Sequence, residues 1–228
     1  MNPILLLAKS FVRQNRWLLV ALVGMPFLLG ASLWSPNHAA SRQDTAEIVQ
    51  QEMFYGVAVV TFLASSAIHN EKRSRRIVGV LSKNVSRRQY LLAMLVGAAC
   101  FAAAYFASVG VAMVGLLGRS GTVANAALAL FVRGTVAALW TASIGLFLST
   151  FLHPFLAAAF ATVLALAPFA LIRLNTFLTP VVMLLKGSGE LIQTIPLAVL
   201  LSALAELAIM LLFAARIFRR RDVSVSIE

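Results

Sequence analysis

The densest group of charged side chains in this sequence is a basic stretch between two apolar runs. Residues 71–89 read EKRSRRIVGVLSKNVSRRQ and hold seven of the chain's 19 lysine and arginine residues. Apolar side chains recur within it at the spacing of one helix face: Ile77, Val78, Val80 and Leu81. A helix here would present an apolar patch beside a cationic one, which favours docking on another protein. The alternative is a solvated loop that only sets membrane orientation, and it leaves the apolar patch without a role.

Other patterns that carry chemistry are missing from the sequence. A phosphate-binding loop needs a Gly-Lys pair, and none occurs in the chain. His38, His69, His153 and the single Cys100 lack the spacing of a metal-ligating motif, and no Gly-x-Ser-x-Gly elbow is present. We therefore expect that the chain is not an enzyme and that it binds no metal or cofactor itself.

The composition is that of an integral membrane protein. Hydrophobic residues make up 61% of the chain and charged residues 12%, and the mean hydropathy is +0.90. The net charge of +11 lies in loops and ends beside apolar runs, which indicates membrane topology and attraction to anionic lipid rather than nucleic-acid binding. No segment is long and polar enough to fold as a soluble domain, so residues 1–228 form a single membrane domain.

Six apolar runs approach the roughly 20 residues that a helix needs to cross a bilayer. They are residues 17–34, 53–69, 90–117, 123–149, 154–172 and 194–216. With six spans, fourteen lysine and arginine residues fall on one side and four on the other. Because cytoplasmic loops collect these residues, both termini are predicted to be cytoplasmic.

Residues 1–16 are predicted to form an amphipathic helix on the inner membrane surface. Lys9, Arg13 and Arg16 have the spacing i, i+4, i+7 and share one helical face, while apolar residues occupy the remainder. The alternative is a simple extension of the first span. Further along, Ser86 and Gln89 fit a capping box, so we expect a helix break at about residues 83–85 and a new helix after Ser86.

Two ionisable residues fall within predicted spans, Arg133 in the fourth and Glu206 in the sixth. Charges in lipid are costly unless they are paired or hydrated. Counted from the outer ends of their spans the two residues have similar depths, which permits an ion pair. The alternatives for Arg133 are a side chain that extends to the outer membrane surface and a place on a substrate path.

Small residues at i+4 spacing predict close helix packing within the membrane. Three such stripes occur: Ala99-Ala103-Ala107, Gly134-Ala138-Ala142 and Ala157-Ala161-Ala165.

The whole pattern resembles the permease subunits of type-2 ATP-binding-cassette (ABC) exporters. Glu71 matches the family's acidic residue at the end of span two, residues 79–81 fall in its Gly-to-Leu stretch, and residues 85–87 match its Val-Ser-Arg. The chain departs from the family at Asn84, where Pro is frequent, and at Met94 or Leu95, where Lys is usual.

The resemblance implies that residues 70–89 are a cytoplasmic coupling loop that contacts a separate ATPase subunit. The contacting residues would be Glu71, Lys72, Arg73, Arg75, Arg76, Val78, Val80 and Leu81. ATP and Mg would bind in that partner, and the permease would pair with a second copy or a related permease in a bacterial-type inner membrane. The resemblance also implies short outer helices over residues 173–193, where the mix of apolar and polar residues predicts helices that dip back toward the membrane and a disordered loop is the alternative. A stand-alone transporter or channel, and an intramembrane enzyme, are the alternative functions.

Overall fold

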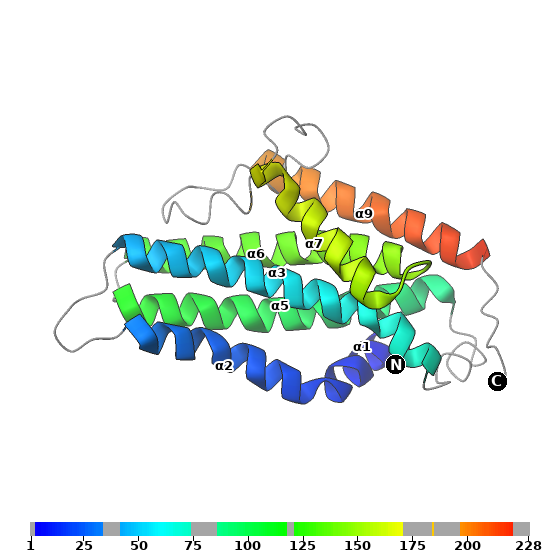
Figure 1. Cartoon of the computed structure of the whole chain (residues 1–228), viewed down its shortest axis with the longest axis horizontal. Coiled ribbons are helices and arrows are strands. Elements are labelled where there is room, and N and C mark those ends of the chain that lie inside the picture. The colour runs from blue at the N-terminus through cyan, green and yellow to red at the C-terminus, as the bar shows by residue number, and fades with distance from the viewer. Residues whose placement is uncertain are drawn as a thin grey trace.

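The computed structural model describes residues 3–33, 42–73, 86–117, 121–170, 184 and 197–220. Within these residues the chain contains seven long helices and no strand (Figure 1). The helices are α1 (Pro3–Gln14), α2 (Arg16–Leu33), α3 (Arg42–Arg73), α5 (Arg87–Leu117), α6 (Gly121–Ser149), α7 (Pro154–Ala170) and α9 (Leu197–Arg220). The predicted all-helical architecture is therefore confirmed for the described part of the chain.

Four of these helices are long and apolar enough to cross a membrane. The qualifying segments lie in α3, α5, α6 and α9: Glu47–Asn70, Arg88–Leu117, Thr122–Ser149 and Leu197–Ile217. The apolar segments of α2 and α7 are shorter, at Arg16–Leu28 and Pro154–Ala165. A helical membrane protein is thus the class that the fold supports, whereas six complete crossings remain a prediction. Residues 173–183 and 185–193 of the expected outer segment lie outside the described residues.

The helix α6 lies at the centre of the bundle and packs against α3, α5, α7 and α9. It contributes the fully buried Trp140, while α5 contributes the fully buried Phe101, Tyr105 and Phe106. The helix α9 is peripheral, because only 11% of its apolar segment is buried, against 61% for that of α3. Lipid or another protein must therefore cover most of α9.

Glycines allow the central helices to approach closely around one aromatic ring. A Cβ atom at Gly56 of α3 would lie 2.8 Å from Cζ of Phe106, and one at Gly134 of α6 would lie 2.6 Å from Cγ of the same residue. Real Cβ atoms do not approach other atoms this closely. Phe106 of α5 therefore fills a space that exists only because both facing residues lack side chains.

Two of the three predicted small-residue stripes lie in packed interfaces. All members of Gly134-Ala138-Ala142 on α6 and of Ala157-Ala161-Ala165 on α7 are buried. The third stripe, Ala99-Ala103-Ala107 on α5, lies on a partly exposed face. Packing by this stripe therefore stays a prediction, and the opposite face of α5, with Phe101 and Tyr105, carries the large side chains that form the core.

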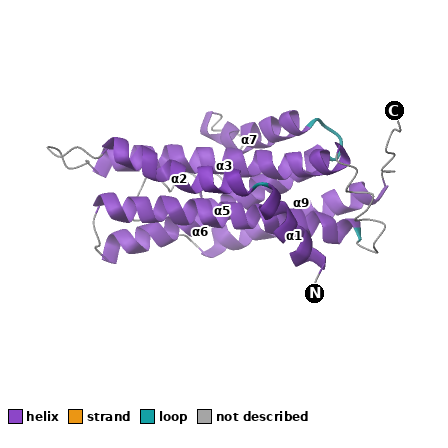
Figure 2. Ribbon diagram, turned by 90° about the horizontal axis from the view of Figure 1, so that it is seen from below, coloured by secondary structure: helices purple, strands orange, loops and turns teal. Residues whose placement is uncertain are grey.

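Most lysines and arginines of the described helices collect at one end of the bundle. The helix α1, the end of α3, the start of α5 and the end of α9 all lie at this end, and α1 runs obliquely to the long helices (Figures 1 and 2). We call it the basic end, since the helices place ten lysines and arginines there: Lys9, Arg13, Arg16, Lys72, Arg73, Arg87, Arg88, Arg216, Arg219 and Arg220. At the opposite end, where α2 ends and α3 begins, the helices place Arg42.

Candidate functional site

The predicted coupling loop begins where α3 ends at the basic end of the bundle. Glu71, Lys72 and Arg73 occupy the last turn of α3. Five other residues predicted to contact the ATPase lie outside the described residues: Arg75, Arg76, Val78, Val80 and Leu81. The docking surface of this loop therefore stays a prediction.

The capping box that closes this loop is confirmed in atomic detail. The backbone N–H of Gln89 donates to Oγ of Ser86 at 3.2 Å, and the backbone N–H of Ser86 donates to Oε1 of Gln89 at 2.9 Å. These two bonds satisfy amide groups that a helix start leaves without intrahelical partners. They fix the point at which α5 begins, directly after residues 74–85.

The helix α1 is amphipathic as predicted and is docked against α5. Lys9 and Arg13 are exposed on α1, while Arg16, predicted on the same helix, is the first residue of α2 and is also exposed. Phe11 is buried and makes an edge-to-face contact with Phe101 of α5 at 5.9 Å between ring centroids. Gly97 makes the contact possible, because a Cβ atom there would overlap the Phe11 ring. The helix thus combines a cationic outer face with an anchored apolar face.

Arg133 lies inside the bundle rather than at its surface. It is the thirteenth residue of α6, and its side chain is only 5% exposed. The alternative in which this side chain extends to the outer membrane surface is therefore wrong, because α6 begins early enough to place Arg133 among the packed helices.

Glu206 joins α9 to α6 through a tryptophan. Its carboxylate accepts a hydrogen bond from Nε1 of Trp140 at 2.9 Å. The helices α6 and α9 run in the same direction (Figure 1). The contact places the Glu206 carboxylate beside the indole of Trp140, a residue about 10 Å further along α6 than Arg133. The depths counted from the sequence were similar, but that count did not include the offset between the two helix starts. The ion pair between Arg133 and Glu206 stays a prediction.

Glu52 is a buried carboxylate that the sequence reading placed in an outer segment. It lies on α3 with 2% of its surface exposed, and the hydroxyl of Tyr105 on α5 contacts both its carboxylate Oε2 and, at 3.0 Å, its backbone carbonyl. Oε1 has no hydrogen-bond partner within the described residues. The missed signal was helical periodicity: the buried positions Val49, Met53 and Val57 continue the face of the predicted span backward.

The histidines at the basic end are closer together than their sequence positions suggest. The rings of His69, near the end of α3, and His153, just before α7, are 5.4 Å apart between centroids. They meet because the connection between α6 and α7 passes the end of α3. Among the described residues, no group of three or more His, Cys, Asp or Glu side chains has the arrangement of a metal site.

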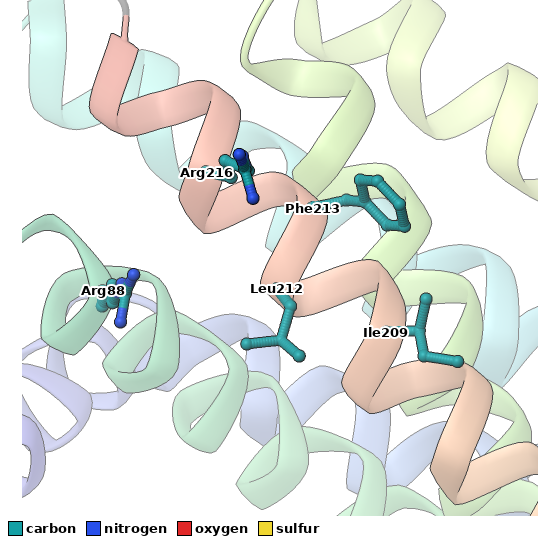
Figure 3. Close-up of a pocket in the computed structure, with 5 residues that line it drawn as sticks. All are labelled: Arg88, Ile209, Leu212, Phe213 and Arg216. Carbon is teal, nitrogen blue, oxygen red and sulfur yellow. The ribbon is translucent and has the colours of Figure 1, made fainter.

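A pocket opens between α5 and α9 at the basic end (Figure 3). Its volume is about 470 Å³, and its lining consists of Arg88, Ile209, Leu212, Phe213 and Arg216. The sequence reading counted both arginines as topology signals and did not bring them together, because they are far apart in the chain. Among the described residues, the lining combines two cations with three apolar side chains and includes no acidic side chain.

In comparisons with known proteins, the chain matches no family model and no curated protein sequence.

Proposed function

We propose that this protein is the membrane-spanning permease subunit of an ATP-driven ABC transporter of the type-2 exporter class. In this role the chain binds no nucleotide. A separate ATPase subunit docks on residues 71–83 at the cytoplasmic side, and substrate moves between two copies of the chain or between it and a related permease.

One feature carries the proposal: the basic and apolar stretch of residues 71–89 joins two long helices. Topology alone needs only a few cations and no apolar patch. The capping box between Ser86 and Gln89 ends this stretch at a defined point. The docked, amphipathic α1 lies at the same end of the bundle and supports a cytoplasmic basic end, since such helices bind anionic membrane surfaces.

The two helices that flank this stretch are suited to transmit movement. The segments that end at Arg73 and begin at Arg87 belong to α3 and α5, which pack against each other and against α6. Tyr105 and Phe106 of α5 fill the space at Gly56 of α3, so neither helix can slide without repacking. A force that the ATPase applies to residues 71–83 would therefore move α3 and α5 together.

The docking proposal is tested by replacing both Val80 and Leu81 with Asp. A carboxylate buried in an apolar groove without a partner costs several kcal/mol, so the double variant should lose the ATPase while it still inserts into the membrane. Ser86→Asp is the matched control, because it adds a carboxylate beside the same loop and Asp also caps helices. Unchanged recovery of the ATPase by the Val80/Leu81 variant would show that these residues are not the contact.

A stand-alone transporter is the second candidate, and Glu52 is the observation that favours it. Carboxylates buried within membrane helices frequently belong to ion or proton pathways, and Glu52 contacts Tyr105 deep inside the bundle. Ion-coupled transport by the purified chain in liposomes without an ATPase, abolished by Glu52→Gln, would favour this function over the permease.

A further inference from the structure

The pocket between α5 and α9 has the chemistry of a site for a charged amphiphile. Arg88 is the second residue of α5, and Arg216 lies near the end of α9. Figure 3 shows the two arginines on neighbouring helices, with the side chain of Leu212 extending from α9 toward α5. Both arginines are exposed. Two guanidinium groups beside apolar side chains complement an anionic head group that carries a hydrocarbon tail.

The surface of α9 continues the apolar part of the pocket along the helix. Leu212 is 66% exposed, and further exposed side chains follow toward the opposite end at Ile209, Leu204 and Leu201. The distance along the helix from Leu201 to Arg216 is about 22 Å. Half of a bilayer core is about 15 Å thick. The exposed surface of α9 is therefore long enough for an acyl chain to lie along it when the lipid phosphate is at Arg216.

We propose that this pocket binds the phosphate head group of an anionic phospholipid from the leaflet at the basic end, with the acyl chains against α9. Arg88 and Arg216 would hold the phosphate, and Ile209, Leu212 and Phe213 would contact the upper part of the chains. The proposal depends on the two arginines and the apolar surface, and it does not depend on an ATPase partner.

A second copy of the chain is a poorer occupant for this pocket. In a two-fold symmetric interface centred here, each protomer would place Arg88 and Arg216 against the same residues of its partner. Four like charges would then meet, and the described lining residues offer no acidic side chain to offset them, which is unfavourable. Charge complementarity therefore favours the lipid.

Lipid retention in nanodiscs of equal parts phosphatidylcholine and phosphatidylglycerol tests the proposal. When the protein is released from the nanodiscs into the gas phase, native mass spectrometry should show that the wild-type protein retains phosphatidylglycerol in preference to phosphatidylcholine. Each basic residue near a membrane surface contributes about a fivefold factor in binding anionic lipid, so the Arg88→Gln, Arg216→Gln double variant should retain about 30-fold less phosphatidylglycerol. The matched control is Arg13→Gln, an exposed arginine on α1 at the same end that does not line the pocket.

Two further variants separate charge from shape. The Arg88→Lys, Arg216→Lys variant keeps both charges and should keep the preference for phosphatidylglycerol. Leu212→Trp fills the pocket without changing its charge and should lower retention.

Three results would overturn the proposal: equal retention of the two lipids by the wild-type protein, equal losses in the double variant and in Arg13→Gln, or displacement of the retained lipid by inorganic phosphate alone. A loss of dimer in the double variant with unchanged lipid retention would assign the surface to a second copy instead.

Discussion

Gly97 of α5 provides the space that Phe11 of α1 occupies, and this contact should decide whether α1 stays docked. A Cβ atom at position 97 would overlap Cδ1 of Phe11 and lie 3.2 Å from its Cγ and Cε1. The Phe11 ring also makes an edge-to-face contact with Phe101 of α5. Inserting a methyl group into a packed interface typically costs about 1–3 kcal/mol. Since α1 has only 12 residues and short helices are marginal alone, we expect α1 to yield rather than α5.

The expected result of Gly97→Ala is therefore a larger undocked fraction of α1. A cost of 1–3 kcal/mol corresponds to an increase of about 5- to 150-fold in the ratio of undocked to docked helix. Ala8 is 4% exposed against the bundle, so the modification rate of Ala8→Cys by a water-soluble maleimide, in a Cys100→Ser background, measures this ratio. Gly24→Ala is the matched control, because a Cβ atom at Gly24 meets nothing within 4 Å.

A second substitution tests whether the Phe11 ring causes the undocking of α1 in Gly97→Ala. Phe11→Leu removes the ring that faces position 97, so it should cancel most of the effect of Gly97→Ala. Equal labelling rates in Gly97→Ala and Gly24→Ala would refute the packing account. An effect of Gly97→Ala that persists unchanged with Leu at position 11 would refute it as well.

The remaining predictions concern the centre of the bundle and are measured as free energies of unfolding in mixed detergent micelles. Gly134→Ala should destabilise the protein by about 1–3 kcal/mol, because the new methyl group collides with a phenyl ring of α5. Gly115→Ala is the control: its methyl group meets nothing within 4 Å, so stability should change by less than about 1 kcal/mol. Equal effects of the two changes would contradict the close packing at Gly134. Glu206→Leu should cost about 1–3 kcal/mol more than Glu206→Gln, because only Gln keeps an acceptor for the Trp140 N–H, and equal costs would show that this bond does not stabilise the fold. If Arg133 and Glu206 also interact, their Gln variants should show a coupling energy above about 0.5 kcal/mol in a double-mutant cycle, and a coupling near zero would rule the pair out.

Local patterns in the sequence predicted much of the fold. The amphipathic spacing of Lys9 and Arg13 identified the exposed face of α1, although the helix ends at Gln14 and Arg16 begins α2. The pair of Ser86 and Gln89 located the start of α5 correctly, because a capping box involves only four consecutive residues. Such features need no knowledge of other helices.

The contacts between helices could not be predicted in the same way. The partner of Glu206 depends on where α9 begins relative to α6, and residue counting from the outer ends did not identify Trp140. The meeting of His69 with His153, and of Arg88 with Arg216, depends on the arrangement of helices that are distant in the chain. Glu52 was missed for a different reason. The helix α3 begins at Arg42, before its apolar run, and the predicted span was limited to that run, although the periodicity of Val49, Met53 and Val57 continues past Glu52.

The central claim is that a separate ATPase drives this chain, and purification from native membranes in mild detergent tests it most directly. ATP hydrolysis is measured on the purified complex and again on the chain after the ATPase subunit has been removed. The account predicts that an ATP-binding-cassette subunit co-purifies, that all nucleotide hydrolysis follows this subunit, and that the chain alone hydrolyses none, since it has no phosphate-binding loop. A chain that purifies without any ATPase, or one that hydrolyses ATP by itself, would contradict the claim.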